Sequence, residues 1–396
     1  MSAGLAFAVS PQEVRLAQLP PLALYVHIPW CVKKCPYCDF NSHQAKGDVP
    51  EKAYVDALVS DLEQALPEVW GRRVGSVFFG GGTPSLFSSA AIEALISAFR
   101  ARLTLLADCE ITLEANPGTF EAEKFRGYRD AGVTRLSIGI QSFDPKHLRA
   151  LGRIHDAEEA RRAIGIAREH FSNINLDLMY ALPGQTLDEA CADVEAAIAA
   201  DVTHLSFYHL TIEPNTHFYR HPPALPDDDA AAAIQDAIGG ALARTGYGHY
   251  ETSAWAKPGR ECRHNLNYWR FGDYLGIGAG AHSKVSFPDR VTRSARWKQP
   301  REYLERVREG RPLQESREIG REDLVFEFMM NALRLAEGFP VGLLAERTGV
   351  QIALAEKPLR EAEARGLIVR NHERIAPSVL GQRFLNDLLQ LFLPVR

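Results

Sequence analysis

Three of the chain's six cysteines lie close together, because Cys31, Cys35 and Cys38 form the spacing C-x3-C-x2-C. Thiols this close share one loop and can ligate one metal centre. A cubane [4Fe–4S] cluster usually takes four thiolates, so three would leave one iron open for a small ligand. A Cys3His zinc site completed by His27 or His43 fits the same spacing. The residues favour iron–sulfur over zinc but leave both interpretations open.

A glycine run follows the next apolar stretch of the chain. Residues 80–84 read Gly-Gly-Gly-Thr-Pro directly after the apolar residues 77–79. Glycines have no Cβ, so such a backbone can approach a bound ligand and offer it N–H and C=O groups. The run lacks the Gly-Lys-Ser/Thr of a phosphate-binding loop. Its position after the cysteine loop indicates a ligand site shared by the two segments.

Four polar residues lie at or just beyond the ends of later apolar runs: Glu114, Gln141, Arg153 and Asp177. One of them alone would more often be a helix cap or a surface ion pair. Together they offer oxygen acceptors for an amino group or ribose hydroxyls, and an arginine fork for a carboxylate. That set suits a zwitterionic nucleoside such as S-adenosylmethionine, whose methionine part could occupy the open iron.

The elements that position these residues follow from hydrophobic periodicity. We expect strands over 22–28, 75–80, 110–115, 133–140, 173–180 and 203–210, and helices near 51–66, 89–101, 120–131, 156–170, 186–199 and 227–245. Ser88 or Ser89, and Thr186 with Glu189, supply cap chemistry before two of the helices. Repeated strand–helix units predict parallel strands in an open sheet or an incomplete barrel. In such barrels the chemistry lies at the carboxyl ends of the strands, where the cysteine and glycine loops fall.

The pattern changes after residue 245. Residues 247–283 are rich in Tyr, Trp, His and Gly and are expected as extended segments and loops. The rest of the chain predicts a winged-helix-like module, with helices over 301–309, 321–336, 340–348, 353–365 and 379–391 and a hairpin over 366–377. Because this module has no dominant basic stripe, a packing role is favoured over DNA binding. We divide the chain into an N-terminal extension (1–21), a partial barrel (22–245), a barrel-edge segment (246–300) and a C-terminal helical domain (301–396).

Bulk properties narrow the class of protein. The net charge of −5 and the isoelectric point near 6.2 show no bias toward nucleic acid or an anionic membrane. No apolar run reaches the ~18 residues of a membrane span, and the first residues do not resemble a signal peptide. We therefore expect a cytoplasmic protein without stable membrane insertion, in which clustered thiols serve metal chemistry rather than disulfides. Cys109, Cys191 and Cys262 are expected to fill the core.

The cysteine motif with Tyr37 before its last cysteine, followed by Gly-Gly-Gly-Thr-Pro, resembles the radical S-adenosylmethionine superfamily. More narrowly, the chain resembles the oxygen-independent coproporphyrinogen III oxidase family in segments 25–31, 113–117, 137–143, 151–155 and 178–186. The resemblance covers nearly the whole chain. It implies an α/β fold, a radical-SAM-type partial (β/α)6 TIM barrel, with a [4Fe–4S] cluster on the three cysteines. It implies S-adenosylmethionine contacts from Tyr25, Tyr37, Gly81, Gly82, Thr83, Glu114, Gln141, Arg153 and Asp177.

Two departures separate the chain from the oxidase itself. Phe40 stands where the oxidase carries a further cysteine, and the segment before Tyr25 is shorter than the oxidase's N-terminal arm. The H-N-x-x-Y-W pattern at residues 264–269 and the glycine-rich segment 276–282 instead match HemW, the oxidase-like subfamily of haem chaperones. This resemblance implies haem as cargo and a haem-accepting protein as partner, with a respiratory protein as one candidate. It disfavours coproporphyrinogen oxidase activity.

His264 is the central residue of the haem hypothesis. A neutral imidazole can ligate haem iron, and Tyr268 and Trp269, in one motif with Asn265, can pack against a porphyrin face. Local sequence alone favours a structural role for His264, and the subfamily resemblance reverses that preference. Candidate second ligands are His209, His217, His249 and His282. The alternative function is oxidative decarboxylation of coproporphyrinogen III by radical chemistry, and a more distant one is another radical reaction.

Overall fold

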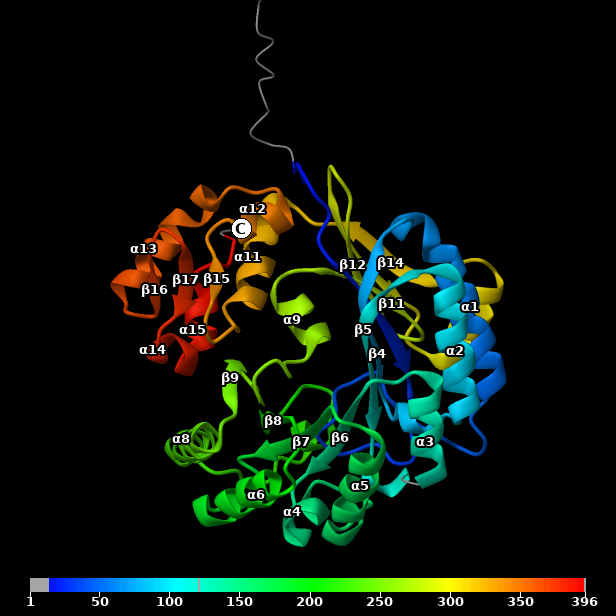
Figure 1. The fold of residues 1–396 in the computed structure, drawn as a ribbon. Coiled ribbons are helices and arrows are strands. Elements are labelled where there is room, and N and C mark those ends of the chain that lie inside the picture. Colours follow the sequence, from blue (N-terminus) through cyan, green and yellow to red (C-terminus); the bar gives the residue numbers. More distant parts are fainter. Residues whose placement is uncertain (1–13, 120–121, 395–396) are drawn as a thin grey trace, which may run out of the picture.

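The computed structural model describes residues 14–119 and 122–394, and its main feature is a curved sheet of twelve strands (Figure 1). The strand order is β14-β13-β12-β11-β1-β4-β5-β6-β7-β8-β10-β9. The six predicted strands form its centre and pair in parallel: β1 (Leu22–Ile28), β4 (Arg73–Gly81), β5 (Thr104–Ala115), β6 (Arg135–Gln141), β7 (Ile174–Tyr180) and β8 (His204–His209). The predicted partial barrel is confirmed.

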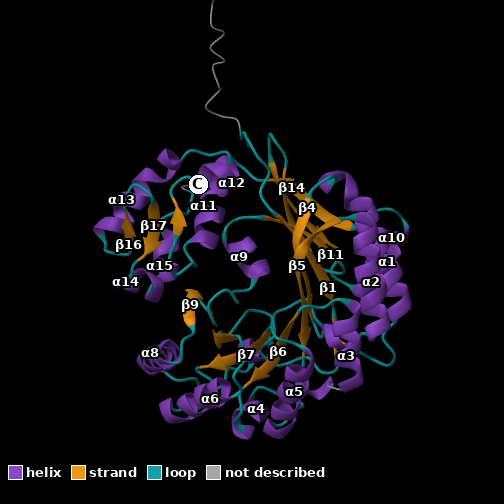
Figure 2. Ribbon diagram, in the orientation of Figure 1, coloured by secondary structure: helices purple, strands orange, loops and turns teal. Residues whose placement is uncertain are grey.

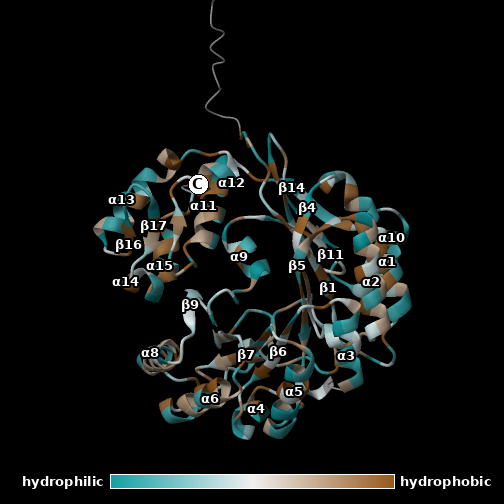
Figure 3. Cartoon of the chain, viewed as in Figure 1, coloured by the Kyte–Doolittle hydropathy of each residue, from teal (hydrophilic) through white to brown (hydrophobic). Residues whose placement is uncertain are grey.

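Six helices that match the predicted ones cover the outside of this sheet: α1 (Glu51–Val69), α2 (Ser89–Arg102), α3 (Ala122–Ala131), α5 (Ala157–His170), α6 (Leu187–Ala199) and α8 (Asp228–Arg244). Residues 120–121 of the third predicted helix lie outside the described residues. Ser88 caps α2, and Thr186 with Glu189 forms a capping box on α6. Figure 3 shows both hydrophilic and hydrophobic residues on these helices, as expected when one face packs on a sheet. Short helices α4 (Pro145–Ala150) and α7 (His217–Arg220) lie in the connections.

The segment after residue 245 extends the sheet at both edges. Strands β9 (Gly248–Glu251) and β10 (Ala254–Ala256) continue it beyond β8. On the other side β11 (Asp273–Ile277) pairs in parallel with β1, and β12 (His282–Ser286), β13 (Val291–Arg296) and β14 (Leu313–Glu318) follow in antiparallel order.

The expectation of extended segments and loops is wrong at one place, because α9 (Arg263–Trp269) is helical and carries the H-N-x-x-Y-W motif. Its first free N–H group is satisfied from outside the segment, since Arg263 N donates to Glu110 Oε1 of β5 at 2.9 Å. A cap from a distant strand leaves no mark in the local sequence. The helix contacts β1, β4, β11 and α11, so it lies inside the curve of the sheet (Figure 2).

A second, smaller core belongs to the C-terminal module. The module holds α11 (Arg321–Ala332), α12 (Leu343–Thr348), α13 (Glu356–Ala364), α14 (Val379–Arg383), α15 (Leu385–Gln390) and the strands β15 (Phe339–Pro340), β16 (Ile368–Arg370) and β17 (Arg374–Pro377). The predicted hairpin is β16–β17. The last predicted helix is divided at Phe384, whose backbone is not helical. In the described part of the chain, each helix is too short or too polar to cross a membrane.

The border between barrel and module differs from the predicted one at residue 301. Helix α10 (Pro300–Arg308) packs against α1, and Tyr303 and Val307 join the barrel core. Tyr303 donates a hydrogen bond to buried Asp61 at 2.9 Å, which ties α10 to α1. The module's core therefore begins near Ile319. Of the predicted N-terminal extension, residues 1–13 lie outside the described residues, and Leu16 packs in the module's core.

Candidate functional site

Two adjoining cavities open inside the curve of the sheet. The cysteine cavity, about 390 Å³, is lined by Cys31, Cys35 and Cys38. The barrel cavity, about 860 Å³, extends inward to α9. Cys38, Phe40, Gly81, Glu114 and Asp177 are among the residues that line both, so the two cavities form one connected site. Both volumes lie in the range of ~300–1,000 Å³ that is usual for small-molecule sites.

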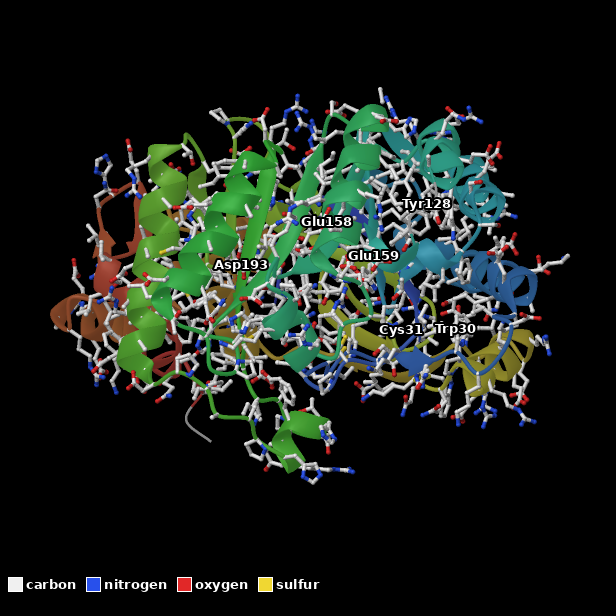
Figure 4. The ribbon with its side chains drawn as sticks, turned by 90° about the horizontal axis from the view of Figure 1, so that it is seen from below. Trp30, Cys31, Tyr128, Glu158, Glu159 and Asp193 are labelled. Atoms are coloured by element: carbon white, nitrogen blue, oxygen red, sulfur yellow. The ribbon has the colours of Figure 1, made fainter. Side chains whose placement is uncertain are left out.

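The cysteine loop leaves the sheet after β1. Cys31 ends the short strand β2 (Trp30–Cys31), which pairs with β3 (His43–Gln44). Figure 4 shows Cys31 beside Trp30 on this strand. All three thiols are half-buried and free, and Cys38 Sγ lies 3.6 Å from Ser42 Oγ. The loop thus directs three thiols toward one cavity.

The geometry of this loop is more open than a zinc site. Zn–S bonds of about 2.3 Å hold tetrahedral ligands roughly 3.8 Å apart. Among the described residues, the one group of three or more potential ligands within 4.8 Å of one another is Asp144, His147 and Glu189. His27, a proposed fourth zinc ligand, has both ring nitrogens engaged, with Tyr25 OH at 3.0 Å and Asn41 O at 2.9 Å. Widely spaced thiols fit a larger cluster.

The glycine run packs directly on the cysteine loop. Gly82 N donates to Ile28 O at 2.8 Å, and Thr83 N donates to Trp30 O at 2.7 Å. A Cβ at Gly82 would lie 2.5 Å from Trp30 O, a distance that forces the backbone apart. Only glycine therefore lets the two loops approach this closely. The run holds the cysteine loop in place and also lines the cysteine cavity.

Arg153 connects the cysteine loop to the strand ends. Its guanidinium donates to Asn116 Oδ1 at 2.6 Å, to Gly139 O at 2.8 Å and to Cys35 Sγ at 3.5 Å, while its Nε is buried without a partner. Gln141 lines the same cavity with a backbone φ of 69°, a left-handed conformation that is strained for a side-chain-bearing residue. Tyr37 and Thr83 complete this wall.

Asn116 is a site residue that the sequence reasoning missed. Its side chain accepts from Arg153 and donates to Thr83 Oγ1 at 2.9 Å, so it joins two predicted site residues. The available signal was its place two residues after Glu114, at the same strand end. Tyr25, which was predicted to contact S-adenosylmethionine, lines the barrel cavity and not the cysteine cavity.

Glu114 and Asp177 form a carboxyl pair on the wall that the two cavities share. Burial and the neighbouring charge of Asp177 raise the pKa of Glu114 to about 8. Burial also raises the pKa of Asp177, which accepts hydrogen bonds from Ser137 Oγ at 2.7 Å and Asn175 Nδ2 at 2.8 Å. Gly81 N donates to Glu114 Oε2 at 3.2 Å. Both carboxyls therefore face the space where a cationic or hydroxyl-bearing ligand would lie.

The raised pKa of Glu114 predicts that the cofactor-free protein loses stability as pH rises. Above an unfolded pKa near 4.5 and below about 8, folded Glu114 keeps a proton that the unfolded chain has lost, so the free energy of unfolding falls with pH. Buried His27 and His264, with lowered pKa values, act in the opposite sense but only below about pH 6.5. Urea unfolding between about pH 7 and 8.5 should show the decline, and Glu114→Gln should flatten it. Equal slopes in both proteins would contradict this assignment.

His264 lies on the wall of the barrel cavity, as do Asn265 and Tyr268. Its ring packs against Phe78 and Tyr25, and its Nδ1 lies 3.2 Å from Ser76 Oγ. Burial, with a contribution from the Arg135 charge, lowers the pKa of His264 to about 3, so the imidazole is neutral. A neutral imidazole on a cavity wall is available as a metal ligand.

Trp269, the last residue of the motif, lies outside the barrel cavity. Its ring lies under the Arg334 guanidinium at 4.5 Å, on the side of the C-terminal module, and it does not line either described cavity. Among the candidate second ligands, His282 lines the barrel cavity and His209 the cysteine cavity. His249 instead stacks on Trp255, and His217 packs beside His221. Cys109 and Cys262 are buried and Cys191 is half-buried.

An incomplete barrel with three thiols and a glycine run at its strand ends defines a radical SAM protein. The radical SAM superfamily model matches residues 25–197, and the HemN C-terminal domain model matches residues 319–384. The chain is 50% identical, over 96% of its length and 100% of the relative's, to the heme chaperone HemW of Escherichia coli (strain K12). It is 47% identical to that of Haemophilus influenzae, over 96% of the chain and 99% of the relative. The chain therefore belongs to the HemW family.

A solved structure supports the fold. Coproporphyrinogen III oxidase (HemN) of Escherichia coli, described as a radical SAM enzyme, aligns with a TM-score of 0.80 at 24% identity, covering 94% of this chain and 90% of that one. At this identity the likeness concerns the architecture of barrel and module. The family resemblance inferred from the motifs is confirmed.

Proposed function

We propose that this protein is a haem chaperone, which holds a [4Fe–4S] cluster and S-adenosylmethionine in the cysteine cavity and haem in the barrel cavity. The observation that carries the proposal is neutral His264 on the wall of a cavity of about 860 Å³ that joins the cysteine cavity. The names of the relatives, heme chaperone HemW, support it.

The residues present fit the cluster and its small ligand. Cys31, Cys35 and Cys38 would ligate three irons, and the bound cluster would supply an open iron for the methionine part of S-adenosylmethionine. Arg153, with its unpartnered Nε, would orient the carboxylate of that ligand. The glycine run and Gln141 would flank the nucleoside, and Glu114 would accept hydrogen bonds from its amino or hydroxyl groups.

The barrel cavity supplies what haem requires from a protein. In the tautomer with its proton on Nδ1, His264 would donate to Ser76 Oγ, and the lone pair of Nε2 would be free to ligate iron. Tyr25, Phe78 and Tyr268 offer aromatic surface for the macrocycle. We infer that haem passes from this cavity to an acceptor protein, with a respiratory protein as one candidate, and that this takes place in the cytoplasm.

One anaerobic preparation tests the proposal against the oxidase alternative. With the cluster reconstituted, the protein should take up about one haem per chain, followed by its Soret absorption, and should leave coproporphyrinogen III unchanged. The physical reason for the second expectation is the absence of the oxidase's extra thiol, where this chain has exposed Phe40 at the shared cavity wall. Formation of protoporphyrinogen without haem uptake would instead establish the oxidase function.

A further inference from the structure

Arg135, at the start of β6, is a buried cation without a partner. Its side chain is among the most deeply buried, at 2% exposure, yet it lines the barrel cavity. It makes no hydrogen bond or ion pair with any other described residue, and its Nε is fully enclosed. By contrast, the equally buried Arg296 bonds Ser283 Oγ at 2.6 Å and pairs with Asp61 at 3.3 Å. Burying an unpaired charge is costly, which indicates that a bound group completes the site.

The acidic groups near Arg135 have other hydrogen-bond donors. Asp177 accepts from Ser137 and Asn175, and Glu110 Oε1 accepts from Arg263 N at the start of α9. Burial by itself lowers the pKa of Arg135, but the neighbouring acidic groups Cys262, Glu110 and Asp177 raise it overall, so the guanidinium stays protonated while its donors remain unused. Its five N–H groups form a planar fork that matches a carboxylate.

The position of Arg135 within the cavity limits which ligand it can contact. In the parallel pairing of β5 and β6, Arg135 lies opposite Thr112, at the amino end of β6 and away from the cysteine loop. It lines the barrel cavity but not the cysteine cavity, which has Arg153 as its own arginine. A group that meets Arg135 thus belongs to the ligand of the barrel cavity, whose wall also carries His264.

We propose that Arg135 binds a propionate carboxylate of the haem and so fixes the orientation of the macrocycle while His264 ligates the iron. This assignment rests on the proposed function. The aromatic residues of the cavity contact the apolar ring but cannot distinguish one edge from the other. The unpaired guanidinium of Arg135 supplies that distinction, because only the propionate edge can pair with it.

Haem and its dimethyl ester, in which both propionates are uncharged, form the matched pair of probes. The wild-type holoprotein should bind haem about tenfold to a hundredfold more tightly than the ester, the ratio expected for a charge-assisted pair of hydrogen bonds. Arg135→Met should reduce the ratio to about threefold or less and leave the affinity for the ester nearly unchanged. Arg135→Lys, which keeps a charge but not the fork, should give an intermediate ratio.

The control is Arg293→Met, which removes another arginine of the same cavity. Arg293 already pairs with Glu327 at 2.7 Å, so the ratio of haem to ester affinity should stay at the wild-type value. A wild-type ratio in Arg135→Met, or a lost ratio in Arg293→Met alone, would overturn the proposal. If the wild-type protein binds neither probe, the proposed function is at fault rather than this residue. If Arg135→Met does not fold, a wild-type ratio in Arg135→Lys overturns the proposal.

Discussion

Replacing Cys31, Cys35 or Cys38 with alanine is expected to abolish the iron–sulfur cluster, so that bound iron, acid-labile sulfide and the brown colour fall to background. The loop offers three thiols for a cluster that already lacks a fourth protein ligand. Cys109 and Cys262 are buried in the fold and cannot take the place of a missing one. Each of the three substitutions should therefore have the same, nearly complete effect.

Cys191→Ala is the matched control for this experiment. Cys191 is half-buried on α6, outside both cavities, and its loss should leave iron and sulfide at the wild-type level. Anaerobic reconstitution followed by iron and sulfide analysis provides the measurement. A colourless wild-type protein with one zinc per chain would show that the cluster assignment is wrong.

His264→Ala is expected to weaken haem binding by at least about a hundredfold and to change the visible spectrum of the bound haem. Losing a direct ligand should cost more than the ~10–100-fold that follows removal of a group holding a ligand in place. Ser76→Ala, which removes the hydrogen-bond partner of Nδ1, falls in that smaller range. Titration with haem, monitored at the Soret band, measures both effects.

Two further measurements separate ligation from general damage. Free imidazole added to His264→Ala should enter the vacated space and restore the spectrum of ligated haem. His249→Ala, which removes a histidine stacked on Trp255 outside both cavities, should bind haem as the wild type does. Unchanged affinity and spectrum in His264→Ala would refute the assignment of this residue.

The parts of the fold that were predictable are those with local signals. Apolar runs alternating with amphipathic stretches predicted the six central strands and their helices, and Thr186 with Glu189 marked a helix start that the structure confirms. Helix α9 was missed because its cap is Glu110, more than a hundred residues away. The packing of α10 on the barrel was not predictable, because the Tyr303–Asp61 contact joins helices that are distant in sequence.

The candidate site likewise has a part that local sequence predicts and a part that it does not. The cysteine loop and the glycine run are each continuous in sequence, so their residue types predicted a shared cavity. Arg135 lines the barrel cavity, and Ser76 contacts His264, only because the sheet is curved. No local sequence pattern predicts either position. A signal for Arg135 was nevertheless present, since it is the one charged residue of the predicted strand 133–140. A charged residue in a strand faces solvent, a charged partner or a ligand.

Helix α9 contacts both the barrel and the C-terminal module. His264 near its start touches the barrel wall, and Trp269 at its end lies under Arg334 of the C-terminal module. This seven-residue helix spans only about 10 Å. Because α9 packs on β1, β4 and β11 as well as on α11, a substitution at the Trp269–Arg334 contact would reach His264 through one short helix.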